Sequence, residues 1–181
     1  MHRSSYDRME SLLAKYADAS APLEVLDVGS AVVGSTYPHG KPIIGGTYRA
    51  FCQPPRHYTG LDIGPGVNVD VVASELYRWP VAPDSIDIVI SGQCLEHVPE
   101  PWTWMDEVYR ITRHGGLAII IAPSGGPCHR FPVDCWRIMP DGMRHIMERA
   151  GFHVVEADFD YQGPQHWNDC WGVGRKCDIS R

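Results

Sequence analysis

The chain has 181 residues, of which 44% are hydrophobic and 21% are charged, and its formal net charge is −6. This length and composition predict one folded domain over residues 1–181 and argue against a disordered protein. The acidic balance argues against nucleic acid as a partner, because a sequence-independent grip on phosphates needs a concentrated basic face.

The termini and the cysteines bear on where the protein resides. The first twenty residues lack the apolar stretch of a signal peptide, and no segment approaches the ~20 apolar residues of a membrane span. We therefore expect a cytoplasmic protein whose six cysteines are reduced and which makes no membrane contact. A zinc site built from Cys128, His129 and Cys135, with Cys170, matches no short CxxC knuckle, so we predict no metal site.

The hydrophobic pattern predicts alternating helices and strands. Met9, Leu12, Leu13 and Tyr16 share one face at helical spacing, which predicts a helix over residues 5–19 within an N-terminal segment 1–21. Further helices are expected over residues 101–113, ending at Gly115-Gly116, and over residues 140–150, with one helical turn near 48–51. Buried strands are expected over residues 23–28, 58–63, 86–91, 117–122, 153–157 and 170–174. This alternation predicts an α/β fold with a mostly parallel sheet.

Two predicted strands end in residues suited to a nucleoside. The first ends in the turn Val28-Gly29-Ser30, where glycine lets the backbone turn sharply and approach a ligand. The second carries Asp62 at its carboxyl end, where ligands bind in open α/β sheets, and a carboxylate there can accept both hydroxyls of a ribose. The alternative is that Gly29 is a plain strand-to-loop turn and that Asp62 caps the turn at residues 64–66.

A third motif follows the strand at 86–91, and with the first two it points to a family. The first is Val25-Leu26-Asp27-Val28-Gly29, at the end of the first predicted strand. The third is Leu95-Glu96-His97-Val98, after the strand at 86–91, and Gly115-Gly116 precedes the next strand. This combination resembles the class I S-adenosylmethionine-dependent methyltransferases, over about residues 23–152. The resemblance implies a Rossmann-like, doubly wound sheet with helices on both faces and S-adenosylmethionine as the cofactor.

The resemblance also implies roles for particular residues. Asp27, Gly29 and Ser30 would face the methionine part of the cofactor, while Asp62 would hold the ribose hydroxyls, with Ile63 against the adenine. Ser74 or Glu75 would lie toward the adenine amino group. Ser91, Gly92 and Gln93 would line the cofactor near its sulfonium.

The acceptor is expected at the loop over residues 124–139, which follows the strand at 117–122 and is dense in polar and aromatic groups. His129 is the first candidate for a base, since the pKa of histidine lies near neutrality, and Asp134 and Arg137 stand beside it. His97 is the second candidate. The alternative is that Asp134, Trp136 and Arg137 form a structural network. The loop over residues 36–57, with Tyr37 and His39, and the pair His166 and Trp167 are further candidate acceptor contacts.

The implied reaction is an in-line methyl transfer to an oxygen or nitrogen of a small molecule, such as a metabolite, a sugar or a natural-product intermediate. A chain this short has little room for an acceptor cap, so a homodimer that completes the site is considered. Two rival functions stay open. A non-catalytic cofactor-binding partner subunit is favoured by the irregular turn at Gly29 to Gly34. A nicotinamide-dependent oxidoreductase would also use Gly29 and Asp62.

Overall fold

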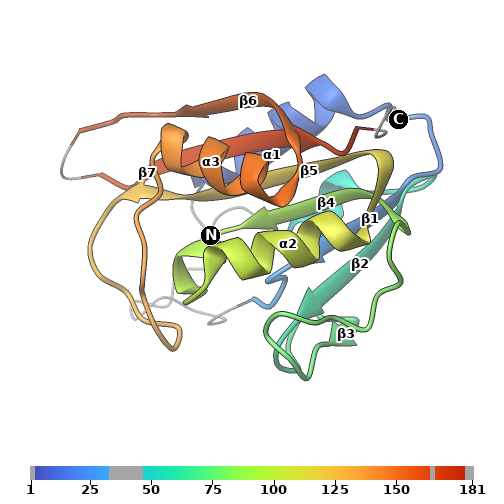
Figure 1. Ribbon diagram of the computed structural model, residues 1–181, viewed down its shortest axis with the longest axis horizontal. Coiled ribbons are helices and arrows are strands. Elements are labelled where there is room, and N and C mark those ends of the chain that lie inside the picture. Colours follow the sequence, from blue (N-terminus) through green and yellow to red (C-terminus); the bar gives the residue numbers. More distant parts are fainter. Residues whose placement is uncertain (1–2, 33–46, 164–165, 178–181) are drawn as a thin grey trace.

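The computed structural model describes residues 3–32, 47–163 and 166–177 of the chain. Within these ranges a twisted sheet of seven strands is covered by helices on both faces (Figure 1). The strands are β1 (Glu24–Val28), β2 (His57–Asp62), β3 (Val71–Val72), β4 (Ile86–Gly92), β5 (Thr112–Gly125), β6 (His153–Phe159) and β7 (Asn168–Arg175).

The order of the strands is β3-β2-β1-β4-β5-β7-β6. β1 pairs in parallel with β2 and β4, and β3 and β5 extend this parallel part on either side. β7 runs antiparallel to both β5 and β6. The classical dinucleotide-binding sheet has the order 3-2-1-4-5-6, so the antiparallel strand between β5 and β6 sets this sheet apart. The carboxyl ends of β1, β2, β4 and β5 meet at one edge.

Helices cover the two faces unequally, as Figure 1 shows. α1 (Arg3–Tyr16) and the short 3-10 helix η1 (Tyr48–Phe51) pack on one face, while α2 (Pro101–Ile111) and α3 (Pro140–Ala150) pack on the other. Successive strand residues point to opposite faces, so Ile119 packs with the α1 side and Ile120 with the α2 side. This explains why the central strands have continuous apolar sequences. The predicted fold class is confirmed.

The last strands are tied to α1 by a partly buried polar junction. Glu156 of β6 has a carboxylate that accepts three hydrogen bonds of 2.6–2.7 Å. The donors are Lys15 Nζ and Tyr16 Oη of α1 and Trp171 Nε1 of β7. Although burial opposes it, these donors lower the pKa of Glu156 to about 2.

Most predicted elements are present, and the differences have local causes. α2 ends at Ile111 rather than at residue 113, because Thr112 adopts extended backbone and starts β5. The expected stop at Gly115-Gly116 was therefore wrong: both glycines lie inside β5. A Cβ at Gly116 would come within 2.8 Å of the Asp87 carbonyl, so this glycine permits close approach of β4.

Part of one predicted loop is outside the described residues. Gly34, Tyr37 and His39 all belong to that part. The single helical turn predicted near residues 48–51 is confirmed as η1. In the described ranges, no helix has both the length and the apolarity needed to cross a membrane.

Candidate functional site

The turn after β1 is the first part of the candidate site. Gly29 has a φ of +78°, a conformation that non-glycine residues adopt only with strain. Its N–H and that of Ser30 donate to the Leu61 carbonyl of β2, at 2.9 and 3.1 Å. A Cβ at Gly29 would lie 2.5 Å from Cys94 Sγ, so the segment after β4 packs directly against this turn.

Asp62, the last residue of β2, presents its carboxylate beside this turn. Oδ2 accepts the Ala31 N–H at 2.9 Å, and Oδ1 accepts the Ile63 N–H at 2.7 Å. A carboxylate offers about four lone-pair positions, so two are left to accept hydroxyls. Ile63 follows with 55% of its surface exposed, an apolar side chain at the same edge. These residues fit a nucleoside, with its ribose at Asp62 and its base over Ile63.

Asp27 of β1 is buried beneath the turn. It accepts a hydrogen bond from Tyr58 Oη at 2.5 Å, and burial raises the pKa of its carboxyl to about 7. Asn68 Nδ2 donates both to Tyr58 Oη, at 2.8 Å, and to the Ser30 carbonyl, at 3.0 Å. Tyr58 and Asn68 therefore position Asp27 and Ser30. Neither residue was predicted from the sequence, because neither belongs to a motif.

The other predicted cofactor residues differ in their surroundings. Ser74 and Glu75 are exposed just after β3, held near Asp62 because the Ala73 N–H donates to the Asp62 carbonyl at 2.8 Å. Ser91 is fully buried, and its hydroxyl donates to the Val28 carbonyl at 2.7 Å. Ser91 thus joins β4 to β1 through its side chain.

Gly92 and Gln93 follow at the end of β4. A Cβ at Gly92 would lie 1.9 Å from Tyr48 Oη, so packing against η1 requires this glycine. Gln93 has a φ of +59°, and its Nε2 donates to Asp169 Oδ1 at 2.8 Å. Its Oε1 is buried without a hydrogen-bond partner among the described residues. Among the described residues predicted near the sulfonium, Gln93 is the one whose side chain has a buried hydrogen-bond acceptor, Oε1, without a partner.

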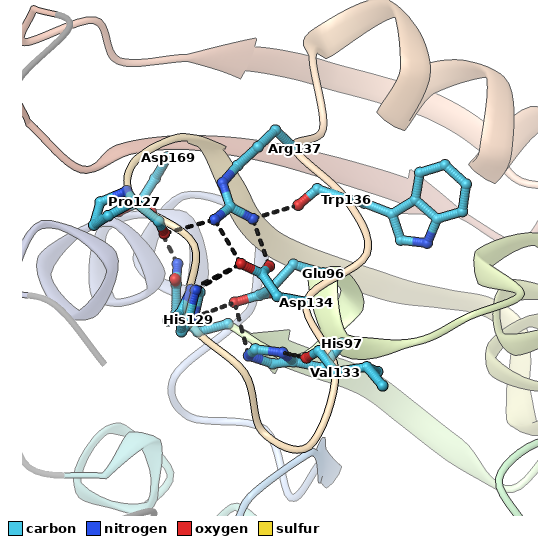
Figure 2. Close-up of polar contacts among 10 residues, drawn as sticks. Glu96, His97, Pro127, His129, Val133, Asp134, Trp136, Arg137 and Asp169 are labelled. Atoms are coloured by element: carbon cyan, nitrogen blue, oxygen red, sulfur yellow. Dashed lines mark hydrogen bonds and ion pairs between the residues drawn. The ribbon is translucent and has the colours of Figure 1, made fainter.

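The candidate acceptor side lies between the short 3-10 helix η2 (Leu95–His97) and the loop after β5. Glu96 is fully buried, and its Oε1 lies 3.5 Å from His97 Nε2 and 3.7 Å from His129 Nε2. Both carboxylate oxygens lack a hydrogen-bond partner among the described residues. The structure therefore brings His97 and His129 to one buried carboxyl group, as Figure 2 shows.

The loop over residues 124–139 is held in place by Asp134. Its carboxylate accepts the His129 N–H at 2.7 Å and two hydrogen bonds from Arg137, at 2.6 and 2.9 Å (Figure 2). The Arg137 guanidinium also donates to the Pro127 carbonyl at 2.8 Å and holds the pKa of the Asp134 carboxyl well below its usual range. The predicted structural network of Asp134 and Arg137 is thus present, and it positions His129.

Aromatic contacts and backbone hydrogen bonds also hold this cluster of residues together. The rings of His97 and His129 meet edge to face at 4.8 Å between centroids, and Trp167 packs edge to face on His129 at the same distance. The Cys135 N–H donates to the Glu96 carbonyl at 2.7 Å, which fastens the loop to η2. Of the predicted pair in the C-terminal loop, Trp167 reaches His129, whereas His166 is exposed.

Burial dominates the electrostatics here. It raises the pKa of the Glu96 carboxyl to about 8, and burial followed by the neighbouring His97 lowers the pKa of His129. All six cysteines are free thiols; Cys128 and Cys135 are exposed and Cys170 is buried. Among the described residues, the side chains that lie close enough together to bind one metal ion are those of Glu96, His97 and His129. The zinc site considered from Cys128, His129 and Cys135 with Cys170 is not formed among these residues.

Comparisons with known proteins agree with this fold. Residues 45–120 match the family model described as a methyltransferase domain. A protein named as an uncharacterized methyltransferase from Mycobacterium avium (strain 104) is 36% identical over 93 residues, which cover 42% of this chain and 37% of that protein. The matches to the first three such mycobacterial relatives cover 20–37% of their own lengths.

Solved structures share the architecture at low identity. The Burkholderia thailandensis 1,6-didemethyltoxoflavin-N1-methyltransferase, with bound 1,6-didemethyltoxoflavin and S-adenosylhomocysteine, superposes with a TM-score of 0.70 and 16% identity, covering 97% of this chain and 80% of that one. A SAM-dependent methyltransferase from Aquifex aeolicus gives a TM-score of 0.61 and 14% identity, covering 96% and 98%. The chain is therefore similar to methyltransferase domains over residues 45–120, and its sheet has the fold of solved S-adenosylmethionine-dependent methyltransferases.

Proposed function

We propose that the chain binds S-adenosylmethionine at the carboxyl edge of β1, β2 and β4 and transfers its methyl group to an oxygen or nitrogen of a small molecule. The observation that carries the proposal is the arrangement of Asp62. Its carboxylate has two acceptor positions left after binding the Ala31 and Ile63 amides, and it stands between the Gly29 turn and the exposed Ile63.

The chemistry divides between cofactor and protein. S-adenosylmethionine supplies a methyl group that is already activated on a sulfonium, so the protein mainly has to align the acceptor. Alignment alone can supply on the order of 7–11 kcal/mol in favourable cases. Asp62 holds the ribose hydroxyls, and Gly29 lets the backbone approach the methionine part. Gln93 Oε1 offers a buried acceptor next to this turn.

The acceptor belongs on the side of His129, His97 and Asp134. Cys94 packs on Gly29, and Glu96, which lies 3.5 and 3.7 Å from the two histidines, follows two residues later in the chain. The backbone N–H of His129 donates a hydrogen bond to the Asp134 carboxylate, and the His129 ring packs against Trp167. Trp167 and the nearby Phe131, which is 53% exposed, offer apolar surface suited to a ring-containing or aliphatic acceptor.

A second candidate function is binding of a nicotinamide cofactor, and the sheet order argues against it. A dinucleotide-binding sheet continues in parallel to its sixth strand, whereas β7 here is antiparallel to β5. The other alternative is a partner subunit that binds the cofactor but does not catalyse methyl transfer. It would bind the cofactor as an enzyme does, so an assay of methyl transfer distinguishes the two. A homodimer stays a prediction.

The experiment is a binding comparison followed by a transfer assay. Calorimetry with S-adenosylhomocysteine should give saturable binding at one site per chain, and NADH should give none. The unmodified protein should then move labelled methyl from S-adenosylmethionine to a compound in a small-molecule extract. Binding of NADH without binding of S-adenosylhomocysteine would refute the proposal, and cofactor binding without any transfer would favour the partner subunit.

A further inference from the structure

We propose that Glu96, His97 and His129 bind a divalent transition-metal ion. Their three ligand atoms, one carboxylate oxygen and one imidazole nitrogen from each histidine, all lie within 4.8 Å of one another. Two imidazoles and one carboxylate form the donor set of many Zn²⁺ and Fe²⁺ sites, whereas Mg²⁺ and Ca²⁺ prefer oxygen donors alone. We assign the site to the Zn²⁺-like class, with open positions for a water or a substrate atom.

The buried carboxylate is the independent observation behind the proposal. Glu96 has no exposed surface, and neither of its side-chain oxygens has a hydrogen-bond partner among the described residues. A buried polar group without a partner costs free energy, which is why such groups are nearly always satisfied in folded proteins. A bound cation between Glu96 and the two histidines would satisfy it, since metal coordination is one of the two usual ways to compensate a buried charge.

His97 makes the outer hydrogen bond that is typical of a histidine metal ligand, and His129 has a carboxylate near its outer nitrogen. His97 Nδ1 lies 2.5 Å from the Val133 carbonyl, and because a carbonyl only accepts, Nδ1 carries the proton. The lone pair of His97 Nε2 is thereby left toward Glu96. His129 Nδ1 is buried 3.6 Å from Asp134 Oδ2 without a hydrogen-bond partner among the described residues, and its Nε2 also faces Glu96. Histidine ligands usually donate their second ring N–H to a carbonyl or a carboxylate in this manner.

The gaps between the donors are compatible with an ion. Glu96 Oε1 lies 3.5 and 3.7 Å from the two Nε2 atoms, which is too long for hydrogen bonds. Bonds of about 2.0–2.1 Å from zinc to nitrogen and oxygen require neighbouring donors roughly 3–3.5 Å apart. The Glu96 contacts would shorten by a few tenths of an ångström, and the two imidazole nitrogens, which lie within 4.8 Å of each other, would approach by up to about 1.3 Å through side-chain rotation.

The place of the site suggests what the ion would contact. Glu96 lies two residues after Cys94, which packs against Gly29, and His129 belongs to the loop over residues 124–139. If the proposed methyl transfer holds, the ion would bind an acceptor through an oxygen or nitrogen atom. The acceptor would then belong to compounds with a metal-binding hydroxyl, carboxylate or amine. Metal binding itself does not depend on the proposed function.

The test is calorimetric titration of the metal-free full chain with Zn²⁺, supported by the visible absorption of Co²⁺. The wild type should bind one equivalent. Glu96→Gln and His129→Asn should each weaken binding at least about 100-fold, since even loss of an outer contact typically costs 10–100-fold. Exposed residues of α3 supply matched controls, and Glu148→Gln and His145→Asn should bind like the wild type.

Two further measurements separate the explanations. Replacing the exposed Cys128 and Cys135 by serine should leave Zn²⁺ binding unchanged, and its loss there would assign the ion to thiols and overturn the proposal. Unchanged Zn²⁺ affinity in folded Glu96→Gln would also overturn it. Should Glu96→Gln fail to fold, His97→Asn and His129→Asn decide by the same criterion. Calorimetry with S-adenosylhomocysteine on the same samples tests the proposed function separately, because its failure would leave the metal result standing.

Discussion

Replacing Asp62 is the sharpest test of the proposed nucleoside site. The Asp62 carboxylate accepts two backbone amides and has two acceptor positions left for a ribose. Hydrogen bonds to a charged group contribute about 1.5–3 kcal/mol each, so the loss of two costs roughly 3–6 kcal/mol. At 1.4 kcal/mol per tenfold change, Asp62→Ala should weaken S-adenosylhomocysteine binding by at least about 100-fold.

Asp62→Asn gives a graded companion, because its amide keeps one oxygen that accepts. It should lose about one such hydrogen bond and weaken binding by roughly 10- to 100-fold. Asp141→Asn, at an exposed position of α3, is the matched control and should bind like the wild type. Calorimetry measures the dissociation constants, and thermal unfolding checks that each variant is folded. An unchanged dissociation constant in folded Asp62→Ala would show that this carboxylate does not hold the ribose.

Three further outcomes follow from the structure. Glu156→Gln should destabilise the fold by about 1–3 kcal/mol in urea unfolding at pH 7. Because the folded pKa of Glu156 lies near 2, below the usual 4.5, the wild type should lose this stabilisation as the pH falls from about 5 toward 2, and Glu156→Gln should lack that loss. Gly92→Ala should lower stability by about 1–3 kcal/mol or more, since its Cβ would meet Tyr48 Oη at 1.9 Å; an unchanged melting temperature would contradict this packing. Asp134→Asn should reduce Co²⁺ affinity about 10- to 100-fold because the Asp134 carboxylate positions His129 through its backbone N–H and through Arg137, and equal affinity would count against that role.

The fold was largely predictable because its elements have strong local signals. The central strands are buried on both faces and read as continuous apolar runs, and α3 begins with Pro140 and ends before Gly151, which has a φ of +111°. β3 and η2 were not predicted, since elements of two and three residues have no periodicity. The stop after α2 was misplaced because glycines also occur where two strands approach closely.

The candidate site was predictable only where its residues lie within a single local sequence motif. Gly29 and Asp62 follow from strand ends, because the carboxyl edge of a parallel sheet is fixed by topology. The meeting of Glu96 with His129 depends instead on how a loop 33 residues later folds back, which Asp134 and Arg137 determine through contacts between side chains and backbone. No spacing rule encodes such a contact. The assignments of Tyr58 and Asn68 likewise required the structure.

The central claim is that the carboxyl edge of β1, β2 and β4 holds S-adenosylmethionine. A crystal structure of the chain with S-adenosylhomocysteine tests it most directly. The account predicts both ribose hydroxyls within hydrogen-bond distance of the Asp62 carboxylate, the adenine against Ile63 and the methionine part at the Gly29 turn. A ligand bound elsewhere on the chain, or one whose ribose makes no contact with Asp62, would contradict it.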